Sequence, residues 1–296
     1  MLFSIIIPVY NRADIVQRTL DTVVAQTHRP LQLVLVDNCS TDDSLAVLQR
    51  FAGEHNAPDC NVVVTQEQHH TAGAARNRGL QYATGQWLMF FDSDDEMTPN
   101  LVSDYARIVE RERERVDLIS TTSLLKFPDG TSRRAPFFTS DILANHLLHS
   151  QLATQRYAVR REFFTATGCW DASLPVWNDW EMGVRLLLAK PRIAYMGGDS
   201  RVLIHHNGKD SITGTEFHTR AGQWEHVFEQ IEADFHEVSL PNVMRYTRLL
   251  HYRRLVLAAQ YEREQCHEMA QPLFDEAYET LRNSYDNNHQ WRWVIA

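Results

Sequence analysis

The first 95 residues alternate short apolar runs with amphipathic segments, and this alternation limits the folds open to the chain. The apolar runs have no polar interruption, as in strands that are covered on both faces. Strands separated by helices of this length imply right-handed crossovers and a parallel sheet with helices on both faces. The predicted strands cover residues 3–9, 31–36, 62–65 and 87–91, and the predicted helices cover 13–25, 44–52 and 72–83.

Polar residues follow directly after three of these predicted strands. Tyr10 follows the first strand, Asp37 follows the second, and the acidic run 92–95 follows the fourth. Ligands of a parallel α/β sheet bind beyond the carboxyl ends of its strands, so we expect these residues to share one rim. The clustered carboxylates repel one another unless a cation lies among them, and a divalent metal carrying a phosphate is the commonest answer. A solvated turn that caps the next helix is the alternative, because Thr98-Pro99 has the pattern of a helix start.

A segment rich in small residues forms the start of the predicted helix 72–83. It reads Thr71-Ala72-Gly73-Ala74-Ala75-Arg76-Asn77. Small residues allow the start of a helix to approach a ligand closely, and its free amides together with Arg76 would suit a diphosphate. The segment matches neither the GxxxxGK[ST] nor the GxGxxG pattern. It therefore predicts a diphosphate contact outside those two motif classes.

The composition disfavours several classes of partner. A net charge of −9 argues against nucleic acid, whose backbone requires a basic surface, and against a polybasic membrane patch. No apolar run approaches the roughly 18 residues of a membrane span, and the amino terminus lacks a signal-peptide pattern. The cysteines form no CxxC pair, as is typical of reduced thiols. We therefore expect a cytoplasmic protein with no nucleic-acid partner.

Four short motifs, in this order and at this spacing, resemble the family 2 glycosyltransferases. They are Ser4-Ile5-Ile6-Ile7-Pro8-Val9-Tyr10-Asn11, Val36-Asp37-Asn38-Cys39-Ser40-Thr41-Asp42, Ala72-Gly73-Ala74-Ala75-Arg76-Asn77 and Phe91-Asp92-Ser93-Asp94-Asp95. The resemblance implies an α/β protein with the GT-A fold, a Rossmann-like and mainly parallel sheet. It also implies a nucleotide-sugar donor, usually UDP-linked, and a Mn²⁺ or Mg²⁺ ion held by the DxD motif Asp92-Ser93-Asp94.

The same resemblance implies roles for single residues at the strand ends. Asp37 would contact the base, Asp92 the ribose and Asp94 the metal, while Arg76 would contact the uridine or the phosphates. The division of roles between these acids and Asp95 stays open. The expected donor-binding set is Pro8, Tyr10, Asn11, Asp37, Gly73, Arg76, Asp92 and Ser93.

A second metal ligand is expected near the segment 201–206. This segment resembles the family's strand that ends in a histidine, which in several relatives ligates the metal or contacts the diphosphate. His206 is favoured over His205, and a neutral imidazole suits Mn²⁺ better than Mg²⁺. Two histidines at the end of an edge strand, with no ligand, are the alternative.

A tryptophan-rich segment leads into a predicted helix that starts near Asn178. Asp179 falls in the first turn, where the helix dipole favours a carboxylate without any catalysis. The alternative is a general base, because sugar transfer with inversion needs a carboxylate to take the acceptor hydroxyl's proton. The resemblance favours the base, since family members usually carry Glu-Asp here, although this chain has Asn178-Asp179. Trp177 and Asn178 are the expected acceptor-binding residues.

The chain is expected to divide into a GT-A domain, residues 1–215, and a C-terminal helical region, residues 216–296. Within the domain, residues 1–120 would form the nucleotide-sugar-binding half and 121–215 the acceptor-binding half.

The helical region carries an apolar stripe and an apolar end at 291–296. Such stripes are usually core or a protein interface. A homodimer interface and peripheral contact at the inner face of the membrane are both open. The stripe consists of Trp224, Val227, Phe228, Ile231 and Phe235.

The sequence thus predicts an inverting, metal-assisted glycosyltransferase. The donor would be a nucleotide sugar, UDP-linked by resemblance, and the acceptor a saccharide, a lipid-linked saccharide or another glycoconjugate of polysaccharide biosynthesis. Two alternatives stay open. A sugar nucleotidyltransferase would share the sheet and the acidic metal site, but the chain lacks a basic glycine-rich loop after its first strand. A non-catalytic binding module would keep the fold without the chemistry.

Overall fold

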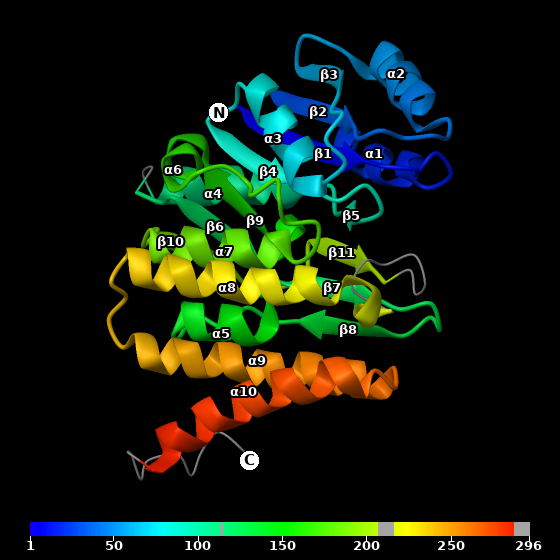
Figure 1. Cartoon of the computed structure of the whole chain (residues 1–296). Helices are drawn as coiled ribbons and strands as arrows, with labels where there is room; N and C mark the ends of the chain where they lie inside the picture. Colours follow the sequence, from blue (N-terminus) through cyan, green and yellow to red (C-terminus); the bar gives the residue numbers. More distant parts are fainter. Residues whose placement is uncertain (113–114, 207–215, 287–296) are drawn as a thin grey trace.

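A seven-stranded sheet forms the centre of the protein (Figure 1). The structure is a computed structural model, which describes residues 1–112, 115–206 and 216–286, with side chains described as far as residue 282. The order of the strands is β10-β6-β9-β4-β1-β2-β3, and β9 runs antiparallel to both of its neighbours. The strands are β1 (Phe3–Val9), β2 (Leu31–Asp37), β3 (Cys60–Gln66), β4 (Trp87–Phe90), β6 (Leu118–Thr121), β9 (Tyr157–Arg160) and β10 (Ile193–Met196).

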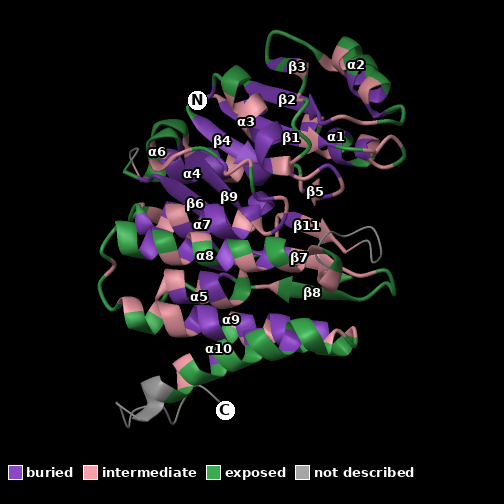
Figure 2. Cartoon of the chain, in the orientation of Figure 1, coloured by how far each residue is buried: buried purple, intermediate pink, exposed green. Residues whose placement is uncertain are grey.

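Helices cover both faces of this sheet because its central strands are apolar on both sides. Ile5 and Leu33 pack on one face, and the adjacent residues Ile6 and Val34 pack on the other. Figure 2 shows these strands as almost wholly buried. The predicted parallel sheet with two covered faces is therefore confirmed. The first face is covered by α1 (Val16–Val24), α2 (Ser44–His55) and α4 (Leu101–Arg111), and the second by α3 (Ala72–Tyr82), α6 (Arg161–Thr167) and α7 (Asn178–Leu188).

A smaller sheet of four strands adjoins the acidic run 92–95. Its order is β5-β11-β7-β8, with β7 and β8 joined as an antiparallel hairpin. Met97 and Val202 of this sheet are buried in the core of the large one. The small sheet is therefore fixed against the rim where the predicted site residues lie. Its strands are β5 (Glu96–Met97), β7 (Ser123–Lys126), β8 (Ser132–Ala135) and β11 (Val202–His205).

The C-terminal helices pack on the same body through α5 (Ile142–His149) and α7 (Figure 1). The predicted apolar stripe from Trp224 to Phe235 is buried against Trp180 and Leu147, so it is core. No helix among the described residues is long and apolar enough to span a membrane. The apolar end 291–296 lies outside the described residues. The C-terminal helices are η3 (Phe217–Arg220), α8 (Ala221–Glu237), α9 (Val243–Arg263) and α10 (His267–Asp286).

Candidate active site

The turns after β1 and β2 form one side of the candidate site. Tyr10 is 42% exposed, and its ring centroid lies 4.1 Å from that of His70. The Asn11 side-chain oxygen accepts a 2.8 Å hydrogen bond from the Thr41 N–H, and the Asn11 N–H donates to the Ser40 hydroxyl. Asn11 has φ 49°, in the left-handed region that asparagine tolerates. As predicted, Tyr10 and the end of β2 share a rim, and Asn11 ties the two turns together.

Asp37 is buried at this rim with one of its oxygens unsatisfied. The residue is 1% exposed, and its Oδ2 accepts a 3.4 Å hydrogen bond from Gln66 Nε2. Its Oδ1 has no hydrogen-bond partner in the structure. A buried acceptor left unpaired costs roughly 1–3 kcal/mol, so such an atom calls for an explanation. A ligand that presents an N–H at this point would satisfy Asp37.

The acidic run after β4 contains three carboxylates in three different environments. Asp92 is clamped on both sides, because its Oδ1 accepts from Arg76 Nη2 at 2.8 Å and its Oδ2 accepts from Gln155 Nε2 at 2.6 Å. Asp95 is 2% exposed, and it accepts hydrogen bonds from the His205 N–H and from the same Gln155 amide. Burial and the negative charges of Asp92 and Asp94 raise the pKa of Asp95 well above its usual range. The hydrogen bond from the His205 N–H to Asp95 ties the acidic run to β11.

Asp94 lies beside two cationic side chains from the start of α1. Its Oδ2 is 4.0 Å from Arg12 Nη2, and its backbone oxygen accepts a 2.6 Å hydrogen bond from Arg18 Nη2. Ser93, between the two outer acids of the DxD motif, is buried. Pro8 is partly buried in β1. The Asp94 carboxylate is an appropriate ligand for Mn²⁺ or Mg²⁺.

His206, the predicted second metal ligand, lies just beyond the end of β11. Its ring stacks on Phe127 with 5.0 Å between the ring centroids, and its backbone N–H donates to the Lys126 carbonyl oxygen at 2.8 Å. Burial and the positive charge of Arg133 lower the pKa of His206, which favours the neutral imidazole that a metal requires. Among the described residues, however, no group of three or more His, Cys, Asp or Glu side chains is assembled for a metal.

Arg76 joins the acidic run to the start of α7. The residue is 4% exposed, and its guanidinium carbon lies 4.5 Å from the centroid of the Trp170 ring. Its Nη1 donates to Asn178 Oδ1 at 2.7 Å, while its Nη2 donates to Asp92. Both terminal nitrogens therefore contact protein, and a direct contact of Arg76 with uridine or phosphate remains a prediction.

Gly73 allows α3 to pack closely against the loop 170–172. A Cβ atom at this position would lie 2.8 Å from the Asp171 carbonyl oxygen. The same loop is held by Thr71, which donates to the Ala172 carbonyl oxygen, and by Asn77, which exchanges hydrogen bonds with the Trp170 backbone. The structure thus gives this glycine a packing role, and its predicted contact with a donor remains a prediction.

The first turn of α7 carries the predicted base. Asp179 is partly buried beside Arg76. Burial and the charge of Asp92 raise the pKa of Asp179, whereas Arg76 lowers it. A carboxylate with a raised pKa is a stronger proton acceptor, as general-base chemistry requires. Asn178 is buried, and its oxygen accepts from Arg76. Its predicted contact with the acceptor remains a prediction.

Trp177, the other predicted acceptor-binding residue, takes part in an aromatic cluster. Its ring centroid lies 4.6 Å from that of Trp224 and 5.4 Å from that of Trp180. The residue is only partly buried. The ring packs on α8, and a contact of Trp177 with an acceptor sugar remains a prediction.

Gln155 was not predicted from the sequence. It lies in the short helix η1 (Thr154–Arg156), immediately before β9, and its single amide group bridges Asp92 and Asp95. No motif marks it in the sequence. Its position depends on β9 entering the sheet between β4 and β6, which only the fold reveals.

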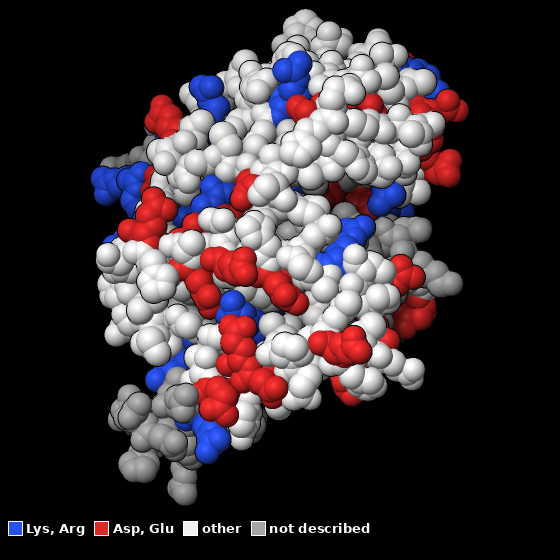
Figure 3. Space-filling model, viewed as in Figure 1, with Lys and Arg blue, Asp and Glu red and all other residues white. Residues whose placement is uncertain are grey.

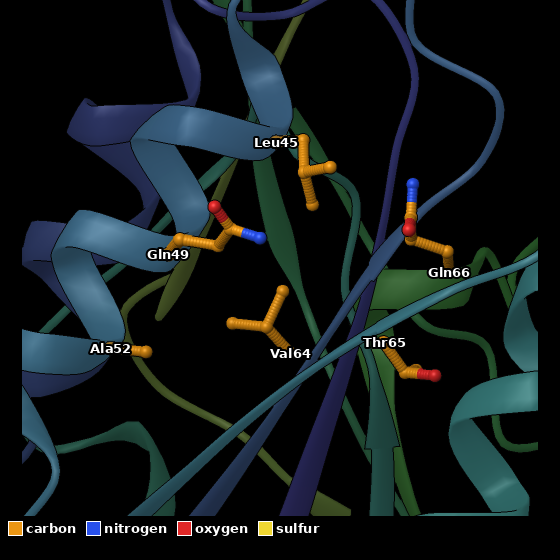
Figure 4. Close-up of a pocket in the computed structure, with 6 residues that line it drawn as sticks. All are labelled: Leu45, Gln49, Ala52, Val64, Thr65 and Gln66. Carbon is orange, nitrogen blue, oxygen red and sulfur yellow. The ribbon is translucent and has the colours of Figure 1, made fainter.

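A cavity of about 350 Å³ lies between α2 and β3 (Figure 4). None of the predicted site residues lines it, although Gln66 contacts both the cavity and Asp37. The cavity is lined by Leu45, Gln49, Ala52, Val64, Thr65 and Gln66.

Figure 3 shows that Asp and Glu side chains gather over α8 and the C-terminal helices on the face in view. That face would repel anionic lipid.

Comparison with known proteins gives matches to glycosyltransferases. The family model described as glycosyl transferase family 2 matches residues 4–163. A PGL/p-HBAD biosynthesis glycosyltransferase of Mycobacterium bovis is 30% identical over 189 residues, which cover 62% of this chain and 69% of that protein. An uncharacterized glycosyltransferase, YibD of Escherichia coli, is 34% identical over 98 residues, which cover 33% of this chain and 27% of that protein. The match thus spans about a quarter of the length of the second relative.

Solved structures share the fold. The crystal structure of S. aureus TarS 1–349 in complex with UDP has a TM-score of 0.68 and 17% identity, and the match covers 100% of this chain and 94% of that one. GalNAc-T7 with UDP, GalNAc and Mn²⁺ has a TM-score of 0.57 and 18% identity, with 77% of this chain and 48% of that one covered. The likeness confirms the predicted GT-A fold with its C-terminal helical region.

Proposed function

Because the chain belongs to glycosyl transferase family 2, we propose that it transfers a sugar from a UDP-sugar to a saccharide or lipid-linked saccharide with inversion. The observation that carries this proposal is the meeting of four distant segments at one rim of the sheet. Asp37, the run 92–95, Arg76 and Asp179 lie on different elements, and hydrogen bonds of Arg76 link Asp92 to Asn178, the residue before Asp179. This arrangement supports a donor site with a base beside it.

The donor nucleotide would bind at the turns after β1 and β2. The unsatisfied Asp37 Oδ1 suits the N3–H of uracil, which is a donor, whereas cytosine has an acceptor at that atom. The exposed ring of Tyr10 offers a face on which a base can stack. Asp92, held by Arg76 and Gln155, would accept from the ribose hydroxyls. The UDP complexes of TarS and GalNAc-T7 support a UDP-linked donor.

A divalent ion would be held by Asp94, with His206 as the second protein ligand. The donor set fits, since one is a carboxylate and the other a histidine whose environment keeps it neutral. When bound, the ion would supply positive charge to the leaving diphosphate. The Mn²⁺ complex of GalNAc-T7 and the imidazole ligand both favour Mn²⁺ over Mg²⁺.

Asp179 would act on the acceptor. Its carboxylate takes the proton of the attacking hydroxyl as the bond between the anomeric carbon and the diphosphate breaks. Burial raises the pKa of Asp179 and makes it a better base, while the positive charge of Arg76 opposes this rise. Trp177, which is only partly buried, would contact the acceptor sugar.

Calorimetric titration of UDP, with GDP and CDP as controls, tests the donor site. Each nucleotide is titrated in Mn²⁺, in Mg²⁺ and in EDTA. We expect UDP to bind in the presence of metal, CDP to bind more weakly, and EDTA to abolish most of the affinity. Failure of every nucleotide to bind under all three conditions would contradict the proposed function and leave only the fold.

A further inference from the structure

Asn178 occupies the position at which family 2 enzymes usually carry a glutamate. Its side chain is 8% exposed, and its Oδ1 accepts a 2.7 Å hydrogen bond from Arg76 Nη1. Its Nδ2 lies 3.5 Å from the Leu174 carbonyl oxygen, at the long limit of a hydrogen bond. The amide is therefore directed mainly at the guanidinium, and it is neutral where a carboxylate would form an ion pair.

Three contacts fix the plane of the Arg76 guanidinium. Asn178 holds Nη1, Asp92 holds Nη2, and the Trp170 ring lies against the flat face. Rotation of the group about its long axis would break at least one of the two hydrogen bonds. Loss of the Asn178 contact would leave Asp92 as the main anchor of the charge.

Asp179 follows Asn178 directly in the chain, and the positive charge of Arg76 lowers its pKa. The charged groups that act on it are Arg76 from α3 and Asp92 from the turn after β4, while Tyr157 faces it from β9. The Tyr157 phenol is neutral, because burial raises its pKa. Arg76 is thus the cation that Asp92 and Asp179 share.

We propose that Asn178 is a positioning residue whose neutral amide holds Arg76 between Asp92 and Asp179, so that its charge stays available to both. A carboxylate at this position would take a share of that charge and add a negative charge beside Asp179. The catalytic meaning of the arrangement rests on the proposed function, whereas the sharing of charge does not.

The test is a carbon-13 NMR titration of the aspartate carboxyl groups in Asn178→Asp. The Asp179 signal is identified by its loss in Asp179→Asn. We expect Asn178→Asp to raise the pKa of Asp179 by about one unit, as a nearby like charge does. The matched control is Asn61→Asp on β3, where the side-chain oxygen also accepts a hydrogen bond, from Gln32 Nε2. This change adds the same charge at the opposite end of the strands, and we expect Asp179 to titrate as in the unaltered protein.

An unchanged Asp179 titration in folded Asn178→Asp overturns the proposal. If circular dichroism shows that this variant does not fold, Asn178→Ala decides the question. Without the amide, Arg76 is held mainly by Asp92, so the pKa of Asp179 is again expected to rise, and no rise overturns the proposal. If Asn178 were merely structural, Asn178→Ala would lower the thermal midpoint of unfolding without moving this titration. Release of UDP from UDP-GlcNAc by the unaltered protein is measured separately, so failure of the proposed function is seen independently.

Discussion

Replacement of Asp37 separates a binding role from a structural one. The residue is buried, and its Oδ1 has no partner in the structure. An atom that is unsatisfied in the free protein does not contribute a hydrogen bond to folding. We therefore expect Asp37→Asn to leave the free energy of unfolding unchanged or to raise it by about 1 kcal/mol, because a buried negative charge is removed.

Replacement of Asp37 is expected to lower the affinity for UDP, more strongly with alanine than with asparagine. A hydrogen bond to a charged group contributes about 1.5–3 kcal/mol, and roughly half of this remains when the acceptor is neutral. Each 1.4 kcal/mol changes Kd about tenfold. Asp37→Asn should therefore weaken UDP binding by about 3- to 10-fold, and Asp37→Ala by about 10- to 100-fold. The preference for UDP over CDP should fall in both variants, and further in Asp37→Ala than in Asp37→Asn.

The assay combines calorimetric titration of UDP with urea unfolding of each variant. Asp117→Asn is the control, because Asp117 directly precedes β6, at the opposite end of the strands from the proposed site, and accepts hydrogen bonds from the Arg192 backbone and guanidinium. It should show the opposite pattern, with lower stability and unchanged UDP affinity. The proposed role of Asp37 is contradicted if Asp37→Asn binds UDP as tightly as the unaltered protein, or if it loses stability as Asp117→Asn does.

Two further predictions concern the metal and the pH dependence of folding. Asp94→Ala should weaken UDP binding about tenfold or more in Mn²⁺ and have little effect in EDTA, since a lost ligand matters only when the ion is present; equal losses in calorimetry under both conditions would remove the metal role. Burial lowers the pKa of His146 from 6.5 to about 4, so its contribution to stability is complete above pH 6.5 and is lost as the pH falls toward 4. From this residue alone, the free energy of unfolding in urea should be about 2–3 kcal/mol lower at pH 4.5 than at pH 7. His146→Gln should show a correspondingly smaller pH dependence, and an identical dependence in both proteins would contradict the assignment.

The parts of the fold that follow from local pattern could be predicted from the sequence. The strands β1, β2 and β4 are continuous apolar runs, and the helices between them are long enough for crossovers. Parallel strands then bring Tyr10, Asp37 and the run 92–95 to one rim without any knowledge of side-chain packing. The sequence pattern also predicted a helix that starts near Asn178, with Asp179 in its first turn.

The contacts that complete the site depend on long-range packing, which no local pattern contains. Arg76 and Asn178 are 102 residues apart in the sequence and meet only because α3 and α7 cover the same face of the sheet. Gln155 reaches Asp92 because β9 enters the sheet antiparallel, between strands that come earlier in the chain. The buried state of Asp95 arises from β11, which returns to the acidic run from 110 residues later.

The most direct test of glycosyl transfer is donor turnover by Asp179→Asn. Release of UDP from UDP-sugars is measured with candidate saccharide acceptors in Mn²⁺, and UDP affinity is measured on the same preparations. We expect turnover to fall by at least about 100-fold, the usual contribution of a general base, while Kd for UDP changes less than about threefold. Retained turnover in Asp179→Asn would contradict the assignment of Asp179 as the base and, with it, the proposed mechanism.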